Sequence, residues 1–142
     1  MENRFDLLGI FEDTKGKYQD KAAFIAMMKQ RTFQGAVRVI KLCDAIPPAP
    51  SNQVIIYQVV KSATSVGNNY RAACRARSQN EFYSKMCIVV EEADETQYWL
   101  QTMQATEKGN QEEVEVLIKE YTEILAVCAT AKDNTYKNIK RK

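Results

Sequence analysis

Three carboxylates have the spacing that paired-acid chemistry requires. Glu91 and Glu95 are four residues apart and Glu92 and Glu95 are three apart, so on a helix they would share one face. Four-helix di-iron proteins build their metal site from such glutamates combined with Glu-x-x-His motifs. The chain contains no histidine, so that site cannot form in its usual way. We therefore expect a structural polar network here, and we predict no enzymatic activity, no metal and no cofactor.

The cysteines do not have the spacing of a zinc site either, since no two of them form a CxxC pair. Each lies in a different predicted helix, at or near an apolar stripe: Cys43, Cys74, Cys87 and Cys128. We expect four buried, reduced thiols that pack as small hydrophobic groups. Reduced thiols are typical of the cytoplasm. The chain has no run of roughly 20 apolar residues and its first residues do not resemble a signal peptide, so we expect no membrane partner.

Basic side chains offer a second kind of chemistry, the binding of phosphate. Residues 61–90 carry five basic side chains and one acid, residues 91–123 carry ten acids and two lysines, and residues 124–142 carry five basic side chains and one acid. Arg71 and Arg75 are four residues apart and would share a helix face. The candidate nucleic-acid-binding residues are Lys61, Arg71, Arg75, Arg77, Lys85, Lys137, Lys140, Arg141 and Lys142.

Two other interpretations of these charges remain open. The basic side chains could simply be solvated, or they could pair with the acidic residues of a neighbouring subunit, namely Glu91, Glu92, Asp94 and Glu95. The pI of about 8.3 is below the value of roughly 9 that is typical of dedicated nucleic-acid binders. No aromatic residues interleave with the basic ones in the sequence to suggest stacking on bases.

Four amphipathic helices must position these side chains in a single domain of 142 residues. We expect the first to begin near Thr32 and to end before Pro47, and the second to begin near Ser51. The third begins at Ser78, because Ser78 and Glu81 form a capping box. The fourth begins near Asn110 and should be followed by a frayed basic tail.

Apolar residues repeat along these helices with steps of three and four, as in packed helix pairs. We expect the first helix to bury Phe33, Val37 and Ile40, with Leu42 and Cys43 near the same side. The second should bury Ile56, Val59, Ala63, Val66, Tyr70 and Ala73. The third should bury Phe82, Met86, Val89, Ala93, Thr96, Leu100 and Met103. The fourth should bury Val114, Leu117, Tyr121, Ile124, Cys128 and Ala131. The fold class is therefore all-α, an up-down four-helix bundle.

The second helix contains an unexpected Gly-Asn-Asn step at residues 67–69. Glycine costs roughly 1 kcal/mol relative to alanine inside a helix. Because the apolar period continues through this step, we expect the helix to continue and Gly67 to permit a close contact with a neighbouring helix. We also expect the Asn69 amide to form a hydrogen bond across that contact.

Residues 61–103 resemble the core of the bacterial four-helix bundle proteins, a family related to proteins encoded in intervening sequences of bacterial large-subunit ribosomal RNA genes. The matching residues are Ser62, Thr64, Ser65, Gly67, Asn69, Tyr70, Arg71, Ser78, Glu81, Phe82, Lys85, Glu92, Ala93, Glu95, Thr96, Tyr98, Trp99 and Leu100. The chain departs from the pattern with Lys61 for Arg, Ala63 for Gly, Asn68 for Ala and Ala72 for Glu. The likeness covers roughly residues 31–131, and residues 1–30 match nothing in the family.

The resemblance implies an architecture more than an activity. Such proteins are four-helix bundles that assemble into rings, often homopentamers, and most have no assigned activity. A distant relative, the accessory variability protein of diversity-generating retroelements, binds a reverse transcriptase and nucleic acid. We therefore predict a cytoplasmic, ring-shaped homo-oligomer that acts as a nucleic-acid-associated accessory protein, with a protein-only scaffold as the alternative. Tyr98 and Trp99 should serve core and interface packing. The predicted parts are an extension at 1–30 that could hold a short helix, the bundle at 31–135 and a basic tail at 136–142.

Overall fold

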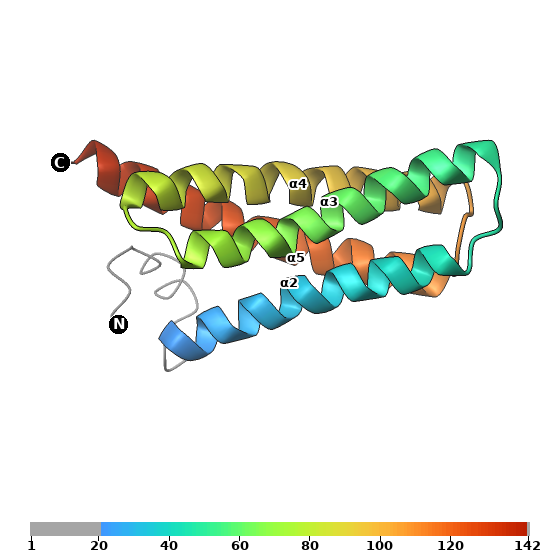
Figure 1. Ribbon diagram of the computed structural model, residues 1–142, viewed down its shortest axis with the longest axis horizontal. Helices are drawn as coiled ribbons and strands as arrows, with labels where there is room; N and C mark the ends of the chain where they lie inside the picture. The colour runs from blue at the N-terminus through green and yellow to red at the C-terminus, as the bar shows by residue number, and fades with distance from the viewer. Residues whose placement is uncertain (1–20, 142) are drawn as a thin grey trace.

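Four helices make up the described part of the protein. The computed structural model describes residues 21–141 and contains α2 (Lys21–Asp44), α3 (Pro50–Cys74), α4 (Gln79–Ala105) and α5 (Gln111–Lys140) in that order. Each helix runs back along the one before it (Figure 1). Within residues 21–141 there is no strand, so the predicted all-α, up-down four-helix bundle is confirmed.

The helix ends follow from local side-chain chemistry. Ser78 caps α4, and its hydroxyl accepts a hydrogen bond from the Glu81 amide at 3.0 Å, which is the first half of the predicted capping box. The Glu81 carboxylate accepts from the backbone amide of Arg77 at 3.3 Å, one residue before the expected donor. Asn110 caps α5 in the same way, with its side chain accepting from the Glu113 amide at 3.1 Å. Gly109, which precedes this cap, has a positive φ of 79°, a conformation that favours glycine.

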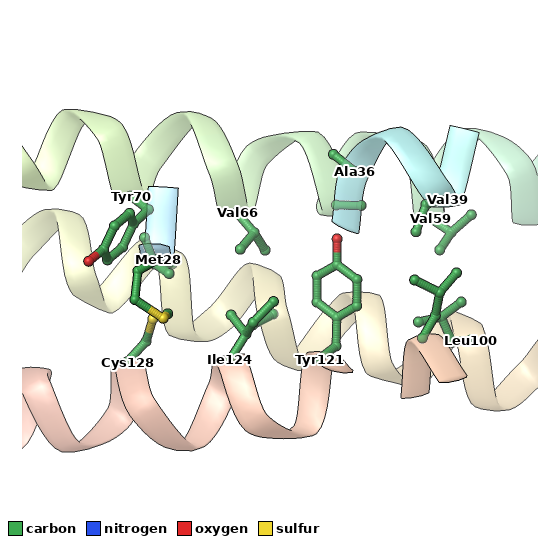
Figure 2. Packing of buried hydrophobic residues seen from close by; sticks show 14 of the residues in the cluster. Met28, Ala36, Val39, Val59, Val66, Tyr70, Leu100, Tyr121, Ile124 and Cys128 are labelled. Atoms are coloured by element: carbon green, nitrogen blue, oxygen red, sulfur yellow. The ribbon is translucent and has the colours of Figure 1, made fainter. Parts of the chain in front are cut away.

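The predicted core of α4 and α5 is correct at every position: all seven residues expected in α4 and all six expected in α5 are buried. In α3 the prediction holds from Val59 to Ala73, but Ile55 is buried in place of Ile56. Figure 2 shows Tyr121 and Ile124 of α5 directed toward the residues of the facing helices. The period of three and four therefore locates nearly all of the core positions of α3, α4 and α5.

The prediction for the first helix is wrong in two respects. Within the described residues α2 begins at Lys21, not near Thr32, and Thr32 is a buried residue in the middle of the helix. The inward stripe consists of Phe24, Met28, Thr32, Gly35, Ala36, Val39, Leu42 and Cys43. The expected core residues Phe33 and Ile40 are instead 53% and 38% exposed. In the middle of α2 the inner face carries the small residues Thr32, Gly35 and Ala36, so hydrophobicity alone does not reveal the stripe there.

The expectation of a frayed basic tail after the fourth helix is also corrected, because α5 remains helical to Lys140. Thr135 in this last section is fully buried, so the helix still has a packed face there. Helices α2 and α5 run across the boundaries predicted at residues 30 and 135. Residues 1–20 and 142 lie outside the described residues. None of the described helices combines the length and apolar character needed to cross a membrane.

Ion pairs close the side of the bundle where α2 meets α5. Arg31 donates to Glu120 through Nε at 2.9 Å and through Nη2 at 2.6 Å, and it also pairs with Glu123. Arg38 forms a second pair with Glu113. Helix α2 contacts α3 more extensively than it contacts α5. These bidentate pairs therefore add directional contacts where apolar packing is thinner.

Candidate nucleic-acid interface

The topology collects most of the predicted basic residues at one end of the bundle. Because each helix reverses direction, the carboxyl ends of α3 and α5 lie beside the amino ends of α2 and α4 (Figure 1). We call this end of the molecule the basic end. Its residues are Lys29, Arg71, Arg75, Arg77, Lys85, Lys137, Lys140 and Arg141. Lys29 was not among the sequence candidates, and only the fold places it here.

The side chains of the basic end are largely free to meet a ligand. Arg71, Arg75 and Lys140 are exposed, and Lys85 is half-buried. Arg77 pairs with Glu81, with 3.3 Å between Nε and Oε2, yet its side chain is 89% exposed. Among residues 21–141 the other members of the basic end form no ion pair. Their charge is therefore not neutralised within the described chain.

The basic end has two faces. Arg71 follows Gly67 by one helical turn, so it lies on the side of α3 that faces α2. Lys29 of α2 is close enough to Cys74 for its charge to oppose the rise in the pKa of that thiol that burial causes. On the other side, Tyr136 of α5 packs on Tyr83 of α4 with ring centroids 5.6 Å apart.

The tyrosine pair is a feature that sequence reasoning missed. Lys140 Nζ lies 5.4 Å from the centroid of the Tyr136 ring, so an aromatic group does accompany the basic tail. The only sequence signal is the four-residue spacing of Tyr136 and Lys140. The sequence alone does not identify Tyr83 as the partner of Tyr136, because their contact depends on the register of α4 against α5.

Two sequence candidates are not brought to the basic end. Lys61 lies in the middle of α3, about 15 Å along the helix axis from Arg71. Its Nζ is 5.8 Å from the Tyr57 ring centroid, and its charge opposes the upward shift that burial and Glu95 impose on the pKa of Glu92. Lys142 lies outside the described residues.

The motif residues of α3 serve the packing of helices. The hydroxyls of Ser62 and Thr96 share a buried hydrogen bond of 2.8 Å that joins α3 to α4. Thr64 donates to the carbonyl oxygen of Val60, one turn earlier in the same helix. Tyr70 is buried, and burial raises its pKa well above the usual range. These contacts indicate a structural role.

Gly67 and Asn69 differ in what they contact. Helix α3 continues through both, and a β-carbon at position 67 would lie 3.3 Å from the carbonyl oxygen of Thr32. The expected close helix contact at Gly67 is therefore present. The hydrogen bond expected from Asn69 across this contact is not formed: its amide donates to the carbonyl and hydroxyl oxygens of Ser65, both at 2.9 Å. Positions 67 and 69 are about 200° apart around the helix, so they cannot face the same neighbour.

The carboxylates and aromatics of α4 differ in how deeply they are buried. Glu91 is exposed, while Glu92 and Glu95 are half-buried. Within residues 21–141 no group of three or more potential ligands could hold a metal ion. Tyr98 is 60% exposed, contrary to the expectation of core packing, and it meets the half-buried Trp99 edge to face at a centroid distance of 5.1 Å.

All four cysteines are free, one in each helix, but only two of them are buried. Burial raises the pKa of Cys128 to about 12, and burial together with the charge of Asp44 raises the pKa of Cys43 to about 11. Cys74 and Cys87 are half-buried, so the expectation of four buried thiols is correct for two of them.

Comparison with known proteins agrees with this fold. The family model described as 23S rRNA-intervening sequence protein matches residues 26–130. A crystal structure of a protein of unknown function, from the S23 ribosomal protein family of Bacteroides thetaiotaomicron, is 31% identical in sequence. The match covers 74% of this chain and 97% of that one, with a TM-score of 0.68. No curated protein matches the chain.

Proposed function

The chain belongs to the 23S rRNA-intervening sequence protein family, and on that premise we propose that it is a non-enzymatic protein that binds nucleic acid through the basic end. The observation that carries the proposal is the group of cationic side chains at one end of the bundle, among which Arg71, Arg75 and Lys140 are exposed and form no ion pair within residues 21–141. Each phosphate that such a side chain neutralises releases counterions, so the affinity grows with the number of contacts.

The positions of the acidic residues also favour the basic end as the binding surface. Glu112, Glu113 and Glu115 lie in the first turns of α5, at the opposite end of the bundle. Glu91, Glu92 and Asp94 lie in the middle of α4. A polyanion would therefore be attracted to one end of the molecule and repelled from the rest. The basic end is the surface on which phosphate contact is least opposed.

We also propose that the protein self-associates. The outer face of α2 exposes Phe33 and Ile40, with Val37 between them in the i, i+4, i+7 series, and the exposed apolar groups are not needed for the core of one chain. In a homo-oligomer the basic end would recur once per subunit, which multiplies phosphate contacts. The ring shape, the homopentamer and a reverse transcriptase partner stay predictions from the resemblance.

A protein-only scaffold is the second candidate function. The exposure of Tyr57 (63%) and Val54 (56%) on α3 favours it, because such side chains are suited to a protein partner. The two candidates differ in what the basic end does. A scaffold would tolerate reversal of its charges, whereas a nucleic-acid binder would not.

The experiment compares two double variants with equal changes in net charge. Arg71→Glu with Arg75→Glu alters the basic end, and Lys41→Glu with Lys119→Glu alters exposed lysines toward the opposite end. Fluorescence anisotropy with a labelled structured RNA should show the first variant weakened by at least about tenfold, with a shallower salt dependence, and the second much less affected. Equal affinity of both variants would refute a role for the basic end, and circular dichroism would verify that both variants are folded.

A further inference from the structure

The two tyrosines at the basic end are arranged as a surface that a flat group could cover. Tyr136 is 45% exposed, and one side of its ring rests on Tyr83 at an interplanar angle of 38°. The Tyr83 side chain is itself half-buried against the bundle. Tyr136 is thus supported from behind by a ring that is itself half-buried.

A lysine lies against this pair. Lys140 lies 5.4 Å from the Tyr136 ring centroid, and Lys137 and Arg141 are its exposed neighbours in the last turn of α5. Asp133 is the acid whose charge reaches Tyr83. An exposed aromatic ring with a lysine beside it, and further cations in the same helical turn, provides the two contacts that single strands use, one for the base and one for the phosphate.

We propose that Tyr136, supported by Tyr83, is a stacking site for an unpaired base, so that this face of the basic end binds single-stranded nucleic acid in preference to duplex. The inference rests on the proposed nucleic-acid binding and adds the class of strand. In a duplex the bases are stacked on each other and cannot cover a protein ring. Lys140, which now lies near the ring, would move to the adjacent phosphate.

The chain contains a matched control for this site. Tyr57 of α3 is also exposed and also has a lysine nearby, with Lys61 Nζ 5.8 Å from its ring centroid. It lies away from the basic end and has no second ring against it among the described residues. Tyr136→Leu and Tyr57→Leu therefore remove similar groups from different places.

The test measures the affinity of each variant for an adenine-rich single strand and for a duplex of equal length at one salt concentration. Tyr136→Leu should weaken single-strand binding about tenfold and leave duplex binding nearly unchanged, and Tyr136→Phe should behave like the unmodified protein. Tyr57→Leu should change neither affinity. A 2-aminopurine base in the strand should report stacking that Tyr136→Leu abolishes.

The outcomes separate this inference from the proposed function. If the unmodified protein binds neither ligand, both proposals fall. If it binds both and Tyr136→Leu has no effect, or weakens the duplex as much as the single strand, only the stacking site is refuted. An equal loss in Tyr57→Leu would likewise refute it, because the effect would not be specific to the basic end.

Discussion

Gly67 of α3 faces the backbone of Thr32 in α2, and a β-carbon at position 67 would lie 3.3 Å from the Thr32 carbonyl oxygen. The neighbouring atoms are backbone atoms of a helix, so a side chain cannot be accommodated by a change of rotamer. The glycine thus explains how α3 can contain a poor helix former: the cost of about 1 kcal/mol in helix propensity is offset by closer packing of two helices.

Gly67→Leu should therefore destabilise the protein by roughly 2–3 kcal/mol, because the new side chain forces α2 away from α3. Asn68→Leu is the control, since Asn68 is exposed in the same helix and leucine is the better helix former. Urea unfolding followed by circular dichroism measures both. Equal midpoints for the two variants would show that the close contact contributes nothing.

Tyr121 carries a hydroxyl that is buried and has no hydrogen-bond partner among the described residues. It lies against Gly35, where a β-carbon would come within 2.8 Å of that oxygen. Tyr121→Phe should leave stability unchanged or raise it by about 1 kcal/mol, because no hydrogen bond is lost. Gly35→Ala should destabilise the unmodified protein more than it destabilises Tyr121→Phe. Additive effects in this double-mutant cycle would contradict the contact.

Substitution of Arg31 or Arg38 would measure how much each ion pair stabilises the contact between α2 and α5. The Arg31 side chain is 23% exposed and meets two carboxylates, whereas that of Arg38 is 41% exposed and meets one. Arg31→Met should cost about 1–2 kcal/mol, and Arg38→Met less than about 1 kcal/mol. Thermal unfolding at low and high salt measures the difference, which screening should reduce. The reverse order of the two costs would contradict this account.

The buried thiols make stability depend on alkaline pH. The folded-state pKa values of Cys43 and Cys128, about 11 and about 12, exceed the ordinary value of 9.0. A group whose pKa is raised on folding stabilises the protein below its unfolded pKa, and this contribution is lost as the pH rises toward the folded pKa. Each thiol should therefore lower the free energy of unfolding by roughly 1 kcal/mol per pH unit above pH 9.

Urea titrations at several pH values between about 8 and 11 test this dependence. Cys128→Val should have a flatter profile than the unmodified protein over that range, because one of the two groups is removed. The burial of Tyr70 and Tyr121 raises their pKa values as well, so some pH dependence remains in the variant. Identical profiles would mean that Cys128 does not contribute.

The sequence predicted α4 and α5 well and α2 poorly, for a physical reason. Most buried positions of α4 and α5 are occupied by large apolar side chains, such as Phe82, Leu100 and Ile124, which mark the core by their period. On α2 the inward face contains Thr32, Gly35 and Ala36, while Phe33 is outside. Hydrophobicity alone assigns such a helix to the wrong face.

For the candidate site, the sequence identified the basic residues but not their arrangement. That Arg71, Lys85 and Lys140 share one end follows from the up-down topology, which was predicted. The contact of Tyr83 with Tyr136 depends on the register of α4 against α5, which no local pattern specifies. Lys61 belongs to the basic segment at residues 61–90, but its position along α3 separates it from the residues of the basic end.

If the protein binds nucleic acid through clustered cations, the mass measured by light scattering must depend on both RNA and salt. The protein is measured alone and with a structured RNA, at about 50 mM and about 500 mM salt. We expect a particle larger than one chain. Its mass should increase by that of the RNA at low salt, and the bound RNA should dissociate at high salt. A mass that is the same with and without RNA at both salt concentrations would show that the protein does not bind RNA and would refute the proposed function.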